Sequence, residues 1–465
     1  MRIIIDNLGV IRHAEMDIKD ITIICGKNNT GKTYATYAYY GFLDFFNNGL
    51  TNSISDVIDL KKIDITPLKD KGILSIDIKN YLDNYASLLQ KICKIYSEKI
   101  NRVFVSNASR FKDTKFEIQI NDVKIAKILK IKLKFADRIQ IETRPSENTI
   151  IITKIKDDDK ISFPEYILKN LIGHFILRSI FQSVFQQTYF IASVERTGAS
   201  IFKKELYLNR NRIVEQLSES SSKKDIDLRD VLFNSYSPYP LPVKDNVTFI
   251  QELSLLGEES PLSESHPEIL NEFSKIVGGK YSLDKEGEVT FIPSSKIHRQ
   301  AKLQLTESSS VVRALIHIDY YLRYKARVGD LLIVDEPELN LHPENQRKIA
   351  RLFARIANAG IKVFITTHSD YIVKELSTLI MFSQKTDETE AIRTKYGYFE
   401  DEIIDEDKIC VYIAENEKIN GKKRSKEYNT LTPAPISQEY GIELKTFDEV
   451  INTMNEIQDS LIWRE

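Results

Sequence analysis

The chain has 465 residues, 42% of them hydrophobic, which is enough for two or three domains with large cores. Its 65 lysines and arginines nearly balance 67 aspartates and glutamates, which excludes a global positive field as the basis of nucleic-acid binding. Three widely spaced cysteines, Cys25, Cys93 and Cys410, lack metal-ligand spacing and are typical of a reduced compartment. Because we find no signal peptide and no membrane-length apolar run, we expect a soluble, cytoplasmic protein without membrane contact.

The first informative segment is residues 26–33, GKNNTGKT, which fits the phosphate-loop pattern G-x-x-x-x-G-K-[ST]. An apolar run precedes it and a helix-like stretch begins at Lys32, which is the context that this loop requires. We expect Lys32 to reach the β- and γ-phosphates of ATP and the Thr33 hydroxyl to ligate Mg²⁺. The remaining predicted nucleotide-binding residues are Gly26, Asn28, Asn29, Thr30 and Gly31.

The second segment is residues 331–337, LLIVDEP, in which an apolar strand ends in two carboxylates. Nucleotide sites lie outside the carboxyl ends of parallel strands, so this strand would deliver Asp335 and Glu336 to the phosphates. Asp335 would hold Mg²⁺ through water, and Glu336 would orient or deprotonate the attacking water. The alternative is an acidic surface turn, because Asp-Glu-Pro is also good turn chemistry.

The third segment is residues 362–369, KVFITTHS, a second buried strand that ends in two threonines and His368. A single histidine is more often a core or surface residue than a catalytic one. Since this strand should neighbour the Asp335 strand, we predict that His368 contacts the γ-phosphate and takes part in catalysis.

Together these segments resemble the ABC-type ATPases, and within them the heads of SMC-like and OLD-family (overcoming lysogenisation defect) proteins. Residues 335–343, DEPELNLHP, are similar to the D-E-P-E-x-x-L-H-P run of that subgroup, and residues 367–369, THS, to its switch-histidine motif. The resemblance covers residues 1–48 and 186–382. It implies an α/β fold, an ABC-type P-loop NTPase head that binds ATP and Mg²⁺.

ABC proteins also carry a signature, similar to L-S-G-G-Q, that contacts the γ-phosphate bound by a partner subunit. The corresponding residues here are Ser308, Ser309 and Ser310, at the start of a helical pattern. The resemblance implies that they close a composite ATP site in a homodimer or higher homo-oligomer, although Ser310 stands where many relatives have Gly. Serines at a helix start are also ordinary N-caps, so a purely structural role stays open.

The resemblance is interrupted by residues 49–185, which we predict to form an inserted α+β lobe. Helical patterns at 78–103 and 164–185 flank four strand-like runs, and sustained heptads of a coiled-coil arm are absent. One of these runs alternates Lys130, Lys132 and Lys134 with apolar residues. Such a stripe indicates either an edge strand protected by lysines or a contact with a phosphate backbone.

Two further segments lie near or beyond the predicted head. Residues 194–198, VERTG, resemble the position of an arginine motif near the nucleotide in OLD-like heads, and a plain helix-start turn at Arg196 is the alternative. Residues 383–406 are polar and acidic, and we interpret them as a linker. It would lead to a small C-terminal α/β segment within residues 383–465, with one strand at 409–413, a basic loop and a helix at 447–462.

This C-terminal segment is too short for the TOPRIM nuclease domain of full OLD proteins. The resemblance therefore implies a stand-alone OLD-like ATPase subunit of a prokaryotic anti-phage system, similar to those of Septu, PARIS and certain retrons. Such a subunit would control a separate effector, of nuclease or TOPRIM type, in response to a nucleic acid or a phage protein. The alternatives are an SMC-like DNA-repair or chromosome-maintenance ATPase, which should carry a coiled coil, and a transporter's nucleotide-binding subunit, which should be shorter.

Overall fold

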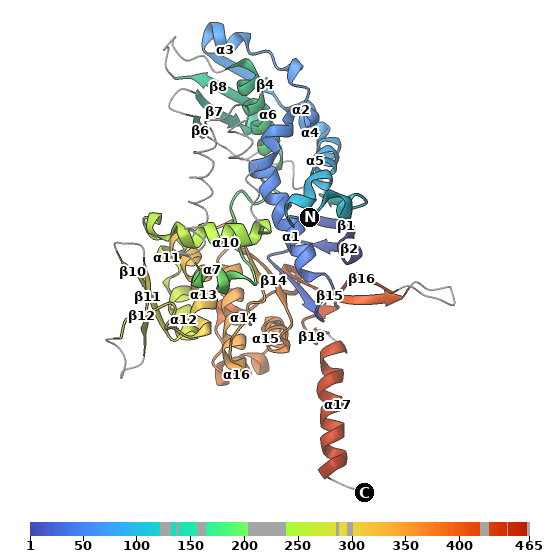
Figure 1. The fold of residues 1–465 in the computed structure, drawn as a ribbon, viewed down its shortest axis with the longest axis vertical. Helices are drawn as coiled ribbons and strands as arrows, with labels where there is room; N and C mark the ends of the chain where they lie inside the picture. Colours follow the sequence, from blue (N-terminus) through green and yellow to red (C-terminus); the bar gives the residue numbers. More distant parts are fainter. Residues whose placement is uncertain are drawn as a thin grey trace, which may run out of the picture. The chain divides into compact units, whose positions relative to one another are not determined.

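The computed structural model describes residues 1–120, 132–135, 139–155, 164–202, 239–284, 288–294, 301–418, 427–443 and 445–462. The chain divides into two compact units. The first contains residues 1–15 and 37–189, and the second contains residues 16–36 and 190–465 (Figure 1). Three elements continue from one unit into the other: β2 (Ile11–Asp17), α1 (Lys32–Asp44) and β9 (Tyr189–Ala192).

The first unit combines two sets of strands with helices, as predicted for an α+β lobe. β1 pairs antiparallel with β5, and a separate antiparallel sheet has the order β4-β8-β7-β6. The strands are β1 (Arg2–Leu8), β4 (Ile73–Asp77), β5 (Lys115–Gln119), β6 (Lys132–Phe135), β7 (Ile139–Arg144) and β8 (Thr149–Lys154). The helices are α2 (Ile54–Val57), α3 (Thr66–Lys71), α4 (Lys79–Asp83), α5 (Tyr85–Lys99) and α6 (Glu165–Phe181). The lobe boundaries at residues 49 and 185 stay a prediction.

The lysine stripe lies on β6, an outer strand of the four-stranded sheet. Lys132 and Lys134 are exposed, and their register places them opposite Glu142 and Gln140 of β7. Lysines on the solvent face of an outer strand oppose edge-to-edge pairing with other chains, which favours the protective interpretation over phosphate binding. Lys130 lies outside the described residues.

The second unit is built on a sheet with the strand order β16-β15-β3-β14-β13-β9. Its central strands are β3 (Ile21–Gly26), β13 (Leu331–Asp335) and β14 (Lys362–Thr367), which run parallel to one another. Five consecutive residues of each strand are buried, which is the pattern of a parallel sheet covered on both faces. The predicted α/β fold class is confirmed.

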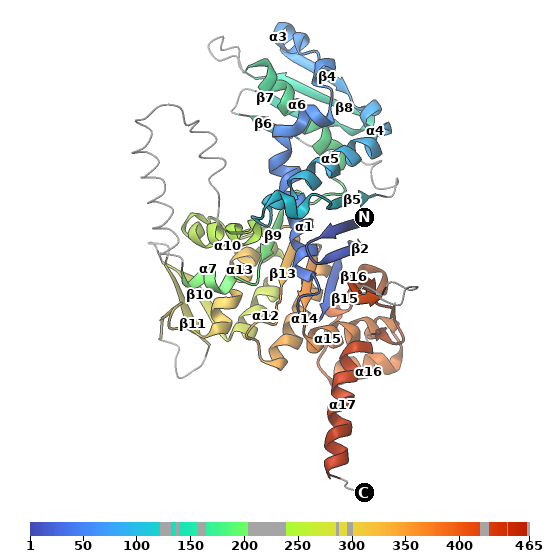
Figure 2. The same ribbon diagram turned by 45° about the vertical axis from the view of Figure 1, so that its right-hand side comes forward.

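Helices surround this sheet, and α14 and α15 lie side by side in both views (Figures 1 and 2). The helices of the second unit, not all of which lie against the sheet, are α7 (Arg196–Ile201), α10 (Leu241–Gln251), α11 (Pro261–Ser265), α12 (Pro267–Val277), α13 (Ser310–Tyr324), α14 (Pro343–Asn358), α15 (Asp370–Met381), α16 (Asp387–Lys395) and α17 (Lys445–Ile462). A small antiparallel sheet contains β10 (Gly279–Leu283), β11 (Val289–Pro293) and β12 (Leu303–Gln304).

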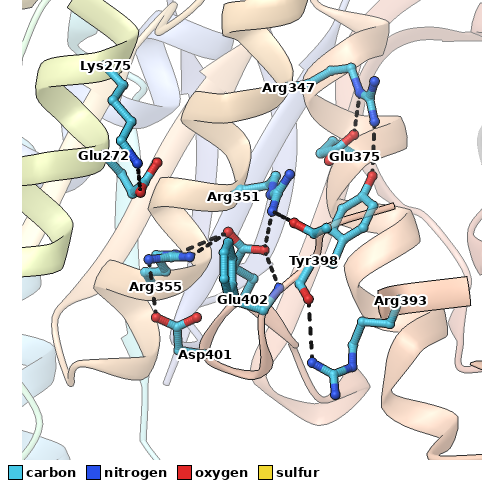
Figure 3. A network of polar contacts seen from close by, with 12 residues as sticks. Glu272, Lys275, Arg347, Arg351, Arg355, Glu375, Arg393, Tyr398, Asp401 and Glu402 are labelled. Carbon is cyan, nitrogen blue, oxygen red and sulfur yellow. Dashed lines mark hydrogen bonds and ion pairs between the residues drawn. The ribbon is translucent and has the colours of Figure 1, made fainter. Parts of the chain in front are cut away.

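Residues 383–406 differ from the predicted linker, because they fold into α16 and short 3₁₀ turns. Ion pairs fasten this segment to α14, since Glu402 contacts both Arg351 and Arg355 (Figure 3). Glu402 is only 3% exposed, so its contacts with the two guanidinium groups are shielded from water. The acidic composition that suggested a linker instead provides the carboxylates for this docking.

The strand predicted at 409–413 is present, and it belongs to the same sheet as the strand before the phosphate loop, a pairing that the sequence did not predict. β15 (Ile409–Lys418) pairs parallel with β3, and β16 (Glu427–Pro433) pairs antiparallel with β15. The sheet that carries the phosphate loop is therefore extended by residues from the end of the chain. Two short strands, β17 (Ile436–Ser437) and β18 (Gly441–Ile442), precede α17, and the predicted basic loop at 422–426 lies outside the described residues.

Candidate functional site

The phosphate loop connects β3 to α1 and is held around one ammonium group. Lys32 is 5% exposed, and its Nζ donates to the carbonyl oxygens of Gly26 at 3.0 Å and Lys27 at 2.7 Å. The Thr30 hydroxyl donates to the Lys27 carbonyl at 2.8 Å, so it supports the loop from within. Asn28 and Asn29 are exposed at the loop's tip. Burial lowers the pKa of Lys32, and the nearby carboxylates oppose that shift.

The register of the central strands brings their carboxyl ends together. Asp335 of β13 lies opposite Thr366 of β14, and Thr367 lies opposite Cys25, the residue before Gly26. The phosphate loop, the Asp335 strand and the histidine strand therefore end at one edge of the sheet. This is the edge at which parallel α/β sheets bind their ligands.

Asp335 is a buried carboxylate with one oxygen left over. Its Oδ1 accepts a hydrogen bond from the Thr366 hydroxyl, whereas its buried Oδ2 has no hydrogen-bond partner. Burial raises the pKa of Asp335 from 3.8 to about 6. An unsatisfied carboxylate oxygen at this sheet edge is a suitable acceptor for a hydrated cation, so the residues present fit Mg²⁺.

Glu336 and His368 form the chemically most informative contact of the site. Nε2 of His368 lies 3.1 Å from Oε1 of Glu336, and Nδ1 lies 3.4 Å from Nζ of Lys32. A lysine ammonium can only donate, so Nδ1 accepts and the proton of the imidazole is on Nε2, facing Glu336. Three of the predicted residues therefore form one chain of hydrogen bonds. The hydrogen bond from His368 lowers the pKa of Glu336.

Two residues that the sequence reasoning did not assign also support this site. Thr366 donates a hydrogen bond to the Asp335 carboxylate and so fixes its position. The two polar residues at the end of the histidine strand were the feature of the sequence that could have indicated this role. Glu338 accepts a hydrogen bond from the backbone N–H of His368 at 2.6 Å, which connects the two strand ends. Glu338 belongs to the DEPE run that carries the resemblance, but the resemblance did not assign it a role.

The three signature serines have different environments. Ser309 is the N-cap of α13, where its side chain accepts from the backbone N–H of Val312 at 3.5 Å. The Ser308 hydroxyl is buried and donates to the Gln304 carbonyl at 2.8 Å, and Ser310 is the first residue of the helix. Within the part of the chain that the structure describes, Ser308 and Ser309 therefore bond to their own segment, and not to the phosphate loop.

Comparison with known proteins identifies the chain's family. Residues 1–373 match the family model described as "AAA ATPase domain", so the chain belongs to that family and is an ATPase of this general type. No curated protein has a matching sequence. Among the described residues, no helix has the length and apolar character needed to cross a bilayer.

Solved structures of SMC heads are also similar. An SmcHead bound to the C-winged helix domain of ScpA has 11% identity and a TM-score of 0.31, over 80% of this chain and 91% of that one. A Pyrococcus furiosus Smc head domain with an extended coiled coil, bound to the C-terminal domain of ScpA, has 8% identity and a TM-score of 0.30, over 98% of both chains. The SMC head domain from Thermotoga maritima has 10% identity and a TM-score of 0.29, over 94% of this chain and 98% of that one.

Proposed function

We propose that this chain binds and hydrolyses MgATP at the edge formed by β3, β13 and β14. The observation that carries the proposal is the hydrogen-bonded chain Lys32–His368–Glu336 beside the unsatisfied Asp335 oxygen. Lys32 would bind the β- and γ-phosphates, and the loop amides would face the same anions. The phosphate loop, the acidic strand and the histidine strand could each occur without the others. ATP hydrolysis requires their lysine, carboxylates and histidine at one place.

The roles of the individual residues follow from their chemistry. Thr33 and Asp335 would hold Mg²⁺, which when bound neutralises charge on the phosphates. Glu336 is the candidate general base, because its lowered pKa keeps it ionised at neutral pH and able to accept a proton from water. His368, with its proton on Nε2, would contact the γ-phosphate once Lys32 and Glu336 engage the nucleotide.

We further propose that two copies of the chain complete each ATP site. The N-terminus of α13, capped by Ser309, would present backbone amides and hydroxyls to the γ-phosphate held by the partner copy. Ser310 and the α13 amides are the better candidates for this contact, since the Ser308 hydroxyl already bonds to Gln304.

At the biological level we propose a sensor or scaffold subunit of a prokaryotic anti-phage system, which controls a separate nuclease or other toxic effector. The support is the resemblance of the DEPELNLHP and THS runs to OLD-like heads, together with the compact α+β lobe. The second candidate, an SMC-like DNA-repair ATPase, is less well supported. In the described part of the first unit the longest helix, α6, has 17 residues, which is short for a coiled-coil arm.

The decisive experiment measures Mg²⁺-dependent ATP turnover and nucleotide binding for the wild type, Lys32→Ala and Glu336→Gln. We expect Lys32→Ala to lose binding and Glu336→Gln to bind ATP but not hydrolyse it. Glu344→Gln, an exposed carboxylate on α14, is the matched control and should hydrolyse ATP normally. Wild-type turnover in Glu336→Gln would contradict the proposed base, and no turnover in the wild type would contradict the proposed activity.

A further inference from the structure

Arg196 is completely buried and donates to four backbone carbonyl groups. It opens α7, and its exposed fraction is 0%. Nη1 donates to Asp335 O at 2.6 Å and to Ser193 O at 2.8 Å, and Nη2 donates to Glu336 O at 2.8 Å. Nε donates to Ala314 O of α13 at 2.8 Å. One guanidinium group thus joins α7, α13 and the end of β13.

The backbone that Arg196 contacts has an unusual conformation. Glu336 has φ of +52°, in the left-handed region that residues with a β-carbon seldom adopt. Such a strained conformation persists only when the surrounding contacts hold it in place. Strained residues of this kind tend to occur at functional sites. The Glu336 N–H donates to Thr366 O at 3.1 Å, and its carbonyl accepts from Arg196, so both sides of this residue are held.

We propose that Arg196 is a positioning residue for ATP hydrolysis. It fixes the peptide groups of Asp335 and Glu336, so that the buried carboxylate is directed to the cation and the next one to the attacking water. This inference rests on the proposed function, because it concerns the same reaction. Arg196 acts through the two acidic residues, because it is fully buried and donates to their carbonyl groups.

The contact with Ala314 also connects the Arg196 guanidinium to α13, the helix that would meet the partner's nucleotide. Ala314 lies in the first turns of α13, whose N-terminus carries the signature serines. A shift of α13 toward a partner's phosphate would change the Ala314–Arg196 distance, and with it the position of the Glu336 carbonyl. Ser200, one turn further along α7, strengthens this connection, since its hydroxyl contacts the carbonyls of both Arg196 and Arg313.

The test compares nucleotide binding in EDTA, nucleotide binding with Mg²⁺ and ATP turnover between Arg196→Lys and the wild type. Binding in EDTA reports whether the protein is folded, and the other two measurements report the positions of Asp335 and Glu336. A lysine keeps the charge but lacks the planar fork, so it cannot serve carbonyls on three elements at once. We expect nucleotide affinity in EDTA to change less than about threefold, because the phosphate loop is unaffected. We expect kcat to fall about a hundredfold, since a misplacement of about 1 Å can have that effect, and the gain in affinity on adding Mg²⁺ to disappear.

The matched control is Arg355→Lys, another buried arginine of the same unit, which contacts Glu402 and Asp401 instead of the sheet edge. It should lower thermal stability and leave kcat and the Mg²⁺ effect unchanged. A second variant, Arg196→Gln, removes the charge that an incompletely bonded lysine would bury. Like Arg196→Lys, it should bind nucleotide normally in EDTA and have a strongly reduced turnover.

The outcomes distinguish this inference from the proposed function. Normal kcat and a normal Mg²⁺ effect in Arg196→Lys would overturn the positioning role while leaving the ATPase intact. If both Arg196 variants lost nucleotide binding in EDTA and unfolded, Arg196 would be a folding residue and the proposal would be wrong. If the wild type had no turnover, the proposed function would fail, and the Mg²⁺ effect on affinity would still test Arg196 through Asp335.

Discussion

Oε1 of Glu336 accepts a hydrogen bond from Nε2 of His368 across 3.1 Å, and each side chain is 28% exposed. The contact joins the candidate base to the residue that directly follows the neighbouring strand β14. Because the proton of the imidazole faces the carboxylate, His368 stabilises the ionised form of Glu336 and lowers its pKa. The histidine strand therefore influences the chemistry of the acidic strand before any nucleotide contact is considered.

Replacing His368 by Ala should raise the pKa of Glu336 toward its ordinary value. Hydrolysis needs the ionised carboxylate, so the acidic limb of the kcat/KM profile should move to higher pH. ATP turnover measured across pH checks this shift. His266→Ala, which removes another histidine–carboxylate pair, is the control and should leave the profile in place. An unchanged acidic limb in His368→Ala would show that the hydrogen bond does not control the base.

Asp335→Asn should change how stability depends on pH. The pKa of Asp335 is 3.8 ordinarily and about 6 in the folded chain, so the folded state binds more protons between these values. Its unfolding free energy should therefore fall as pH rises through this window, relative to the variant, by about 2 kcal/mol from pH 4.5 to 7.5. Urea unfolding without Mg²⁺ at several pH values measures the difference. A difference that stayed constant or grew with pH would contradict the raised pKa.

Gly26→Ala should destabilise the phosphate loop. Gly26 has φ of +135°, and an added β-carbon would lie 2.4 Å from the carbonyl oxygen of Ala414 on β15. The strained backbone alone costs about 1–3 kcal/mol, and nucleotide binding should be lost as well. Gly198→Ala is the control, because it lies in α7 with open space around it and should be neutral or slightly stabilising. Thermal unfolding and nucleotide titration of both variants test this prediction.

Glu402→Gln should release the segment around α16 from α14. The change leaves the guanidinium groups of Arg351 and Arg355 without their shared buried carboxylate, which typically costs about 3–5 kcal/mol. We expect faster hydrogen exchange in residues 387–402 and a lower melting temperature. Glu344→Gln, which breaks an exposed pair with Lys348, should have little effect on either. Equal exchange in the two variants would mean that the buried pairs do not fasten this segment.

Glu336→Gln should form a dimer when ATP is bound. Blocked hydrolysis keeps the γ-phosphate in place, and this phosphate would bridge the phosphate loop of one chain and α13 of the other. Light scattering with and without ATP measures the association. Adding Ser309→Ala should weaken it, because Ser309 caps α13. A strictly monomeric Glu336→Gln protein in saturating ATP would argue against composite sites.

Much of this site was predictable because its residues follow buried strands. Lys32, Asp335 and His368 each lie at a point where an apolar run meets polar residues, and parallel strands place such points at one edge. The resemblance to known ATPases also provided the order in which the three motifs follow one another along the chain. Short-range pattern and local motif were sufficient to predict which residues lie at the ends of these strands.

The rest depended on contacts that the local sequence does not encode. β15 pairs with β3 across almost 400 residues of sequence, and neither strand specifies its partner. α16 is polar and has no buried residue, so its helix lacked apolar periodicity. The segment that follows it docks through buried ion pairs together with Tyr398 and Ile404 of the core, and these contacts are not visible in the local pattern. Arg196 could be recognised as a helix start, but its four carbonyl partners come from separate elements.

The position of β3 has a consequence for how the protein is made. Both neighbours of this strand, β14 and β15, come from the last quarter of the chain. During translation the apolar strand Ile21–Gly26 thus leaves the ribosome long before either partner exists. The phosphate loop cannot gain its native support until synthesis is nearly complete, and the emerging chain has to keep this strand from premature pairing.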